Sequence, residues 1–194
     1  MINNDTLRRL RYALKLNDAK VQATFKLAGV DIPPYHLANI MRKEDEEGFV
    51  PCPNDTLVAF LDGLIIHHRG VQQGREPQPW PKGQYLPNNE ILRKIRIALK
   101  LTDEDIIAMM ALAGFKVSKP ELSALFRKEG HRNYKECGDQ FLRNFIAGLT
   151  IRNRDEAKPK KAAPAAIHRD EQDMADKTSN KTIDPWSKSR GNKR

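Results

Sequence analysis

The sequence is poor in cysteine and has no long apolar run. Its two cysteines, Cys52 and Cys137, belong to no Cys-x-x-Cys pair, so their spacing indicates neither a zinc site nor the disulfide framework of a small secreted domain. No segment approaches the roughly 18 consecutive apolar residues of a membrane-spanning helix, and residues 1–5 lack the basic and apolar regions of a signal peptide. We therefore expect a cytoplasmic protein that binds no metal and no membrane.

Motifs that carry chemistry are also missing. The chain contains no Gly-x-Ser-x-Gly elbow, no phosphate-binding P-loop, no His-Glu-x-x-His zinc motif and no glycine-rich dinucleotide fingerprint. We expect a protein that is not an enzyme and uses no cofactor. An enzyme is the third possibility, since a small helical protein can assemble a site from scattered residues that no motif search detects.

Acidic residues are fewer than basic residues in this chain. The chain has 34 Lys and Arg against 25 Asp and Glu, a formal net charge of +9 and a pI near 9.6. This balance favours polyanionic partners such as nucleic acid or acidic proteins, and it leaves the fold undetermined.

The sequence contains an internal repeat. Shifting the chain against itself by 85 residues aligns residues 3–69 with residues 88–154 without a gap, and 25 of the 67 aligned pairs are identical. The identities fall in runs, such as Ala-Leu-Lys-Leu at residues 13–16 and again at residues 98–101. Chance agreement at one fixed offset would be several-fold lower, so the repeat indicates a tandem duplication.

Apolar residues at helical spacing divide each copy into four helices. Leucines spaced i, i+3, i+7 predict a first helix over about residues 5–16, which opens after asparagine caps. The second helix is predicted to begin at Asn17, or Thr102 in the second copy. It is predicted to end at Gly29 or Gly114, because glycine adopts a positive φ at low cost.

The third and fourth helices have recognisable starts. In the second copy, Ser118 and Glu121 form a capping box with an early proline between them. Pro33-Pro34 stands at the corresponding start in the first copy. The fourth helix follows Asn54 or Asp139 and is the most hydrophobic helix of each copy.

These patterns predict an all-α protein of two tandem four-helix repeats, each burying its own leucine-lined interior. The repeats are expected at residues 1–70 and 88–154, joined by a proline-containing linker at residues 71–87. Residues 155–194 are rich in Lys, Ala, Asp and Pro and have few large apolar groups, so we expect a disordered basic tail there.

The first helix of each copy carries a stripe of basic residues beside its leucine face. Because arginines bind phosphates through bidentate guanidinium contacts, the stripes are candidate nucleic-acid or anion-binding sites. The alternative is a solvated helix face whose arginines pair with nearby acids. The first stripe consists of Arg8, Arg11 and Lys15, and the second stripe consists of Arg93, Arg96 and Lys100.

A second duplicated basic feature lies at the end of the predicted third helix. Arg42 and Lys43 recur as Arg127 and Lys128, and these four residues are further candidates for binding nucleic acid. A structural role is the alternative, because cations near a helix C-terminus complement the helix dipole.

The two cysteines stand at equivalent positions before the fourth helix. Pro51 and Pro53 flank one, and Gly138-Asp139 follows the other, which supplies no metal-ligand spacing. We therefore interpret Cys52 and Cys137 as small buried packing residues.

Several short motifs occur twice: Asn-Asn-x-x-Leu-Arg, Ala-Leu-Lys-Leu-x-Asp, Leu-Ala-Gly, Arg-Lys-Glu and the cysteine before the fourth helix. In this combination they resemble the YehS family of bacterial proteins, a tandem repeat of an uncharacterised domain. The resemblance covers residues 1 to about 154 and implies a bacterial cytoplasmic protein without supplying an activity. Pro33-Pro34 departs from the Ser-x-x-Glu start associated with the repeat, so the third helix is expected to begin differently in the first copy.

The hypothesis that these features favour is a non-catalytic regulatory or adaptor protein that binds RNA or DNA through the two stripes, with the basic tail adding non-specific affinity. The alternative is a protein-interaction module that presents an apolar groove between the repeats to a partner helix or peptide. Steep loss of binding with salt is typical of the first hypothesis and not of the second.

Overall fold

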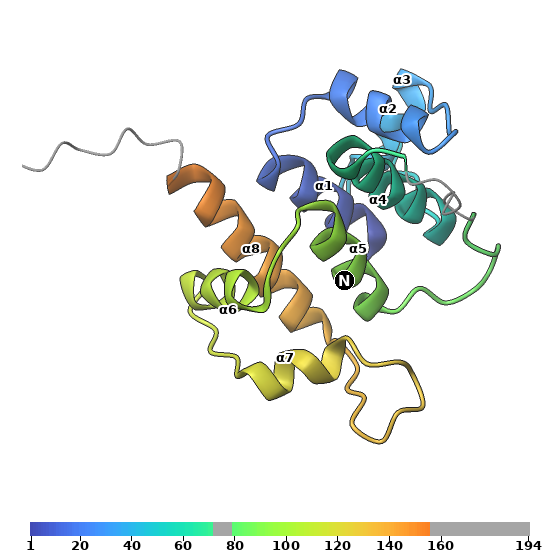
Figure 1. The fold of residues 1–194 in the computed structure, drawn as a ribbon. Helices are drawn as coiled ribbons and strands as arrows, with labels where there is room; N and C mark the ends of the chain where they lie inside the picture. Colours follow the sequence, from blue (N-terminus) through green and yellow to red (C-terminus); the bar gives the residue numbers. More distant parts are fainter. Residues whose placement is uncertain (72–78, 156–194) are drawn as a thin grey trace, which may run out of the picture. The chain divides into compact units, whose positions relative to one another are not determined.

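The computed structural model describes residues 1–71 and 79–155, in which the chain forms eight α-helices and no strand (Figure 1). Four helices belong to each repeat, which confirms the all-α fold of two tandem four-helix repeats. Residues 72–78 of the predicted linker and the predicted tail from residue 156 onward lie outside the described residues. No helix in the described residues has the length and apolar character needed to span a bilayer. The helices are α1 Asn3–Ala13, α2 Asp18–Leu27, α3 Pro34–Ile40 and α4 Asn54–Arg69 in the first repeat, and α5 Asn88–Ala98, α6 Asp103–Leu112, α7 Lys119–Leu125 and α8 Asp139–Asp155 in the second.

The second and third helices begin where the sequence predicts. Asn17 caps α2 by accepting a hydrogen bond from a backbone N–H, and Thr102 caps α6 through a capping box. Ser118 caps α7 in the same way, whereas α3 begins at Pro34 without a side-chain cap. Gly29 adopts the expected positive φ of 76° just beyond α2. A side-chain cap of this kind stabilises a helix by about 1 kcal/mol, so the local sequence determines these helix starts.

The asparagines at the start of the first helix are not caps, because α1 starts earlier than predicted and includes them. Asn4 is buried, and its Nδ2 donates to the carbonyl oxygens of Ile40 and Val50 at 2.8 Å each. Its Oδ1 accepts a hydrogen bond from the N–H of Cys52 at 2.9 Å. Asn89 makes the equivalent three hydrogen bonds in the second repeat. The duplicated asparagine therefore ties the first helix to the loop between the third and fourth helices.

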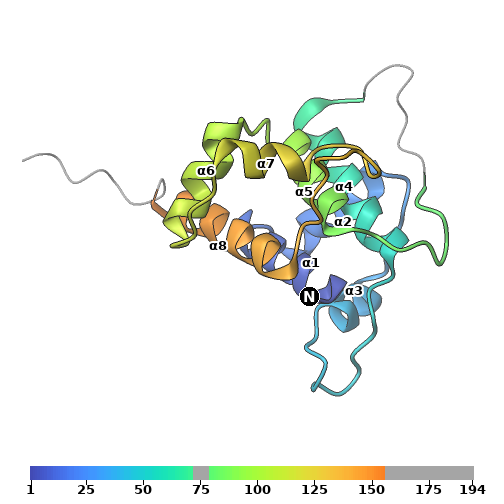
Figure 2. The same cartoon turned by 90° about the horizontal axis from the view of Figure 1, so that it is seen from below.

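The two repeats exchange their first helices. α1 packs along α8 of the second repeat, and α5 packs along α4 of the first. Figure 2 shows α8 beside α1 and α5 beside α4. The expectation that each repeat buries its own interior is wrong, since buried residues of both repeats form one apolar cluster within a single compact unit. Helical periodicity shows which face of a helix is apolar, and it does not show which helix covers that face.

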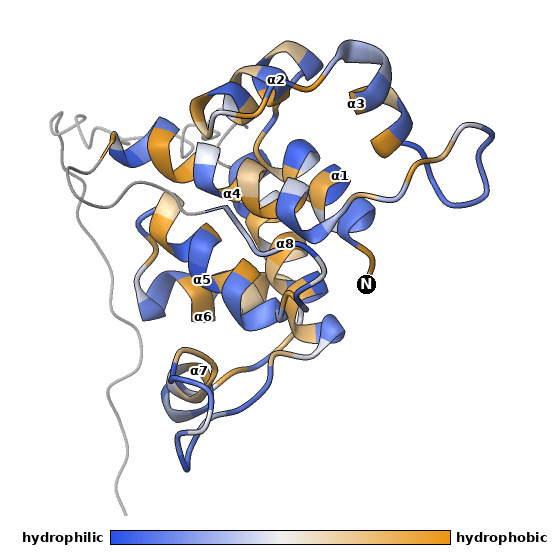
Figure 3. Cartoon of the chain, turned by 90° about the vertical axis from the view of Figure 1, so that its right-hand side faces the viewer, coloured by the Kyte–Doolittle hydropathy of each residue, from blue (hydrophilic) through white to orange (hydrophobic). Residues whose placement is uncertain are grey.

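The shared core is built from the inner faces of the exchanged helices. Leu7 and Leu10 of α1 are fully buried, as are Leu92 and Ile95 at the equivalent positions of α5. Figure 3 shows that the helices carry both apolar and polar residues, as amphipathic helices around one core do. Full burial of each such side chain contributes about 1.5–3 kcal/mol, so both repeats depend on the exchange for stability.

One buried ion pair joins the repeats. The Lys94 Nζ of α5 lies 2.5 Å from the Asp62 Oδ1 of α4, and the two side chains are 15% and 8% exposed. Burial raises the pKa of Asp62, whereas the hydrogen bond and charge of Lys94 lower it. The equivalent positions in the α1–α8 contact are Arg9, which is exposed, and Ala147. The pair is therefore present in one of the two repeated helix contacts and absent from the other, and buried polar groups of this kind can specify register.

Candidate anion-binding site between the repeats

The first stripe lies where the C-terminal ends of α1 and α8 meet. Its residues Arg8, Arg11 and Lys15 line a hollow of about 430 Å³. Tyr12 of α1 and Arg154 of α8 line the same hollow. The structure therefore brings the three predicted residues together and adds two that sequence reasoning missed.

The turn after α1 places the Lys15 side chain against α8. Lys15 adopts a left-handed φ of 54°, which costs a residue with a side chain about 1 kcal/mol. Its Nζ donates to the carbonyl oxygen of Asn153 at 2.7 Å. The Nδ2 of Asn153 in turn donates to the carbonyl oxygen of Ala13 at 2.7 Å. These two hydrogen bonds hold the ends of the two helices together.

An aromatic ring and a guanidinium group from different repeats are stacked in this hollow. The Arg154 guanidinium carbon lies 4.3 Å from the centroid of the Tyr12 ring. The Tyr12 side chain is 56% exposed. A cation over a ring at an exposed site contributes about 0.5–1 kcal/mol, which keeps the charge of α8 beside the charges of α1.

Two carboxylates partly neutralise the first stripe. Arg8 forms an ion pair with Asp5 and donates to the carbonyl oxygen of Arg42. The Arg11 Nη2 lies 2.7 Å from the Asp18 Oδ1. Such pairs are what the alternative interpretation, a solvated helix face whose arginines pair with nearby acids, predicts for the stripe. At exposed sites each ion pair contributes about 0–1 kcal/mol to stability.

The site keeps an excess of positive charge despite these pairs. Four cations line the hollow, two carboxylates oppose them, and two helix C-termini add roughly half a negative charge each. Among the ion pairs of the described residues, none includes Lys15 or Arg154. Lys15 donates to a carbonyl oxygen and Arg154 stacks on Tyr12, so no carboxylate of the described residues neutralises the charges of these two cations.

The arginines of the second stripe form ion pairs with carboxylates of their own repeat. The Arg93 Nη1 lies 2.6 Å from the Glu90 Oε2, and the Arg96 Nη2 lies 2.9 Å from the Asp103 Oδ1. The Arg96 guanidinium carbon also lies 4.5 Å from the centroid of the Phe126 ring. Both arginines are therefore engaged within the repeat, as the alternative interpretation predicts.

The α4–α5 junction differs from the α1–α8 junction in the side chains around its cations. Ile97 stands where the first repeat has Tyr12, and His68 stands where the second repeat has Asn153. Lys100 is exposed and has the same left-handed φ of 54° as its counterpart. The second junction thus repeats the basic residues without the tyrosine and without the asparagine that joins the helix ends.

The remaining four predicted basic residues were expected at the end of the third helix of each repeat, and the structure places them after that helix has ended. Arg42 and Lys43 follow the last residue of α3, and Arg127 and Lys128 follow that of α7. The Arg42 Nε donates to the Asn39 Oδ1 at 3.3 Å. None of these four residues lines the hollow between α1 and α8.

A second hollow, of about 870 Å³, gathers three of the predicted basic residues, Arg93, Arg127 and Lys128. Three carboxylates share its lining, so it carries no excess positive charge and favours anions less than the first hollow does. The carboxylates are Glu90, Glu129 and Glu136, and the aromatic side chains around them are Trp80, Tyr85, Phe126 and Tyr134.

The cysteines are buried packing residues, as the sequence indicates. Cys52 and Cys137 are 5% and 2% exposed. Burial raises the pKa of both thiols to about 12, and the nearby carboxylates of Asp55 and Glu136 add to the effect. A protonated, buried thiol is a poor nucleophile at neutral pH. In the described part of the chain, no group of three or more His, Cys, Asp or Glu side chains is placed to hold a metal ion.

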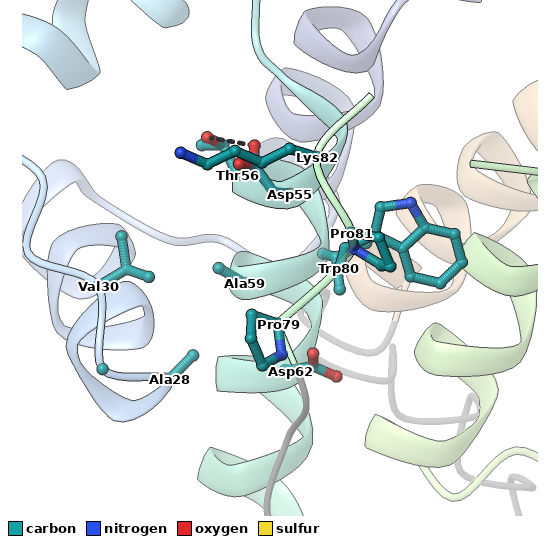
Figure 4. Close-up of a pocket in the computed structure, with 12 residues that line it drawn as sticks. Ala28, Val30, Asp55, Thr56, Ala59, Asp62, Pro79, Trp80, Pro81 and Lys82 are labelled. Atoms are coloured by element: carbon teal, nitrogen blue, oxygen red, sulfur yellow. Dashed lines mark hydrogen bonds between the residues drawn. The ribbon is translucent and has the colours of Figure 1, made fainter. Parts of the chain in front are cut away.

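A hollow of about 600 Å³ lies between the first repeat and residues 79–82, and Asp55, Asp62 and Lys82 are among the residues of its otherwise mostly apolar lining (Figure 4). Val30 beyond α2, Ala59 of α4 and residues 79–82 of the predicted linker line it. Trp80 is half-buried, and its Nε1 donates to the carbonyl oxygen of Gln84 at 3.3 Å. Its lining comes from the first repeat and the predicted linker, so it is not the groove between the repeats that the alternative hypothesis describes.

Comparison with known proteins agrees with the duplicated fold. Residues 3–70 and 88–155 each match the family described as "Protein of unknown function (DUF1456)". The chain therefore belongs to this family, with two copies of its domain in tandem. It is also 43% identical over 152 residues to "Uncharacterized protein YehS" of Escherichia coli (strain K12), which covers 78% of this chain and 96% of that protein. No solved structure matches the chain. The resemblance seen in the sequence is confirmed.

Proposed function

We propose that this protein is a non-catalytic regulatory or adaptor protein of the cytoplasm that binds RNA or DNA by its phosphates at the α1–α8 junction. The observation that carries the proposal is the hollow lined by Arg8, Arg11, Lys15 and Arg154. Guanidinium and ammonium groups bind phosphate oxygens by charge-assisted hydrogen bonds, and the excess positive charge of the hollow attracts a polyanion.

The charge of the whole chain supports a long polyanion over a small anion. The chain carries a formal net charge of +9. From residue 155 onward it has 10 Lys and Arg against 7 Asp and Glu, a net of +3, and this segment continues directly from Arg154. The net positive charge of this segment adds non-specific attraction for a long polyanion, which a single small anion would not use.

The repeat offers a matched pair of variants to test the proposal. The first-junction variant carries Arg8→Gln, Lys15→Gln and Arg154→Gln, and the second-junction variant carries the equivalent changes. Each variant loses three positive charges and keeps residues 155–194, so any difference between them reports the location of the site. The equivalent changes are Arg93→Gln, Lys100→Gln and Arg69→Gln.

The measurement is the affinity of the full chain for a fluorescent 12-nucleotide RNA as the salt concentration is raised. We expect the first-junction variant to bind at least about tenfold more weakly, and its slope of log affinity against log salt to fall by about 2, since each phosphate contact on a single strand contributes roughly 0.7. The second-junction variant should bind nearly as the wild type does. Equal losses of affinity in both variants, or no loss in either, would reject the proposed site. Equal helicity of the variants and the wild type by circular dichroism excludes unfolding as the cause of a lost affinity.

A further inference from the structure

We infer that the nucleic acid held at this site is single-stranded and that one of its bases stacks on Tyr12. The inference rests on the proposed function and specifies its partner. Tyr12 lines the hollow with the cations of α1, so a phosphate bound by those cations brings its own base within reach of the ring.

The Tyr12 ring is placed for stacking. Its side chain is 56% exposed, whereas Leu10 and Ala13, on other faces of the same helix, are buried. The guanidinium of Arg154 already lies over the ring at 4.3 Å, so a planar cationic group occupies this aromatic surface in the free protein. A base stacks on tyrosine or on a guanidinium plane through the same kind of contact, and such stacking depends little on the identity of the base.

Stacking on Tyr12 requires an unpaired base. In a duplex the bases are stacked on one another and paired inside the helix, and the cations of the hollow would meet phosphates alone. A single strand can place a phosphate against Lys15 and Arg154 while its base lies on the ring. The hollow of about 430 Å³ falls within the usual size range of ligand pockets, so it has room for both groups.

The second repeat supplies the control for this inference. Ile97 is the residue equivalent to Tyr12, and it is exposed at 42% on a helix of the same length and register. Tyr12→Ile therefore introduces a residue that the same fold already accepts at the same position. Tyr12→Phe keeps the ring and removes only the hydroxyl.

The experiment compares the full chain and these two variants on a 12-nucleotide single-stranded oligouridine and on a 12-base-pair RNA duplex. We expect Tyr12→Ile to weaken single-strand binding about tenfold or more, since stacking of one base on an aromatic side chain accounts for a loss of that size. Duplex binding should fall by no more than about fivefold, because a duplex loses only the contact of about 0.5–1 kcal/mol by which the Tyr12 ring holds Arg154 in place, and loses no stacked base. Tyr12→Phe should bind the single strand as the wild type does.

The outcomes separate this inference from the proposed function. If Tyr12→Ile leaves single-strand binding unchanged, or weakens single-strand and duplex binding equally, stacking on Tyr12 is ruled out while the loss in the first-junction variant still supports phosphate binding. If the first-junction variant binds as the wild type does, both fail. Uridine monophosphate is the remaining probe: competition by this nucleotide at the same concentration as the oligouridine would show that the ligand is a free nucleotide and would overturn the single-strand inference.

Discussion

Gly63 of α4 faces the carbonyl oxygen of Thr24 of α2 so closely that no side chain fits between them. A β-carbon at Gly63 would lie 1.9 Å from that oxygen. Gly148 of α8 stands in the same relation to the carbonyl oxygen of Met109 of α6, again at 1.9 Å. The glycine of the fourth helix therefore permits the close crossing of the second and fourth helices in both repeats.

Replacing either glycine should destabilise the protein. Because the clash is with backbone, which cannot rotate away, we expect Gly63→Ala and Gly148→Ala each to lower the free energy of unfolding by about 2–3 kcal/mol, as overpacking of a core does. Urea denaturation followed by circular dichroism measures the change. Gly138→Ala is the control, since a β-carbon there meets nothing within 4 Å. Equal stability of Gly63→Ala and Gly138→Ala would contradict the close crossing.

The duplicated buried asparagine should contribute as much as a core residue. Asn4→Ala leaves two carbonyl oxygens and one N–H without their hydrogen-bond partner, as does Asn89→Ala in the second repeat. We expect each change to cost about 3 kcal/mol of unfolding free energy, because each unsatisfied buried group costs about 1–3 kcal/mol. Asn133→Ala, at an exposed position, should cost little in the same thermal or urea titration. A loss below about 1 kcal/mol for both buried asparagines would show that these hydrogen bonds are not formed.

The two thiols should resist modification in the folded protein. Burial raises the pKa of Cys52 and Cys137 from 9.0 to about 12, so both remain protonated at pH 8. We expect Ellman's reagent to react slowly with the native chain and rapidly with both thiols in denaturant. Because the folded-state pKa is raised, the protonated thiols stabilise the fold fully below pH 9.0, and this contribution is lost as the pH rises toward about 12. Rapid reaction of native thiols at pH 8 would contradict their burial.

The ion pair between the repeats should give a pH dependence in the acid range. Burial raises the pKa of Asp62 above its ordinary 3.8, so the protonated carboxyl group of Asp62 favours the folded state. This contribution to stability is fully present below pH 3.8 and is lost as the pH rises through the raised pKa of Asp62. Asp62→Asn should remove this dependence from the unfolding free energy. Lys94→Met removes the charge that opposes the shift, so we expect the loss to move to higher pH. It should also destabilise the protein by about 3–5 kcal/mol near neutral pH, since it leaves a buried carboxylate unpaired. Identical pH profiles for the wild type and Asp62→Asn would refute the assignment.

The fold was predictable wherever the controlling interactions are local. The capping residues Asn17, Thr102 and Ser118 each bond to a backbone group within three residues, so the sequence around them determines the helix starts. The 85-residue repeat was equally visible, because it depends on residue identity alone. The role of Asn4 was not predictable, since its partners Ile40 and Val50 lie 36 and 46 residues away and the local pattern at a helix start favours a cap.

The candidate site was predictable only in part. The spacing of Arg8, Arg11 and Lys15 shows that they share one face of a helix. It does not reveal that Arg154 from the other repeat joins them, because that contact follows from the exchange of first helices. One signal was present in the alignment of the repeats: Tyr12 is replaced by Ile97 between identical flanking residues. This difference shows that the two junctions carry different side chains at the position that lines the hollow in the first repeat.

Photochemical crosslinking shows which residues nucleic acid contacts, and therefore whether it binds at the α1–α8 junction. The full chain would be irradiated with a 12-nucleotide 4-thiouridine RNA, digested, and the crosslinked residues identified by mass spectrometry. We expect crosslinks at Tyr12 and in the peptide that ends at Arg154, with few at the equivalent Ile97 and Arg69. Crosslinks confined to residues 156–194, or distributed equally over the two junctions, would contradict the account.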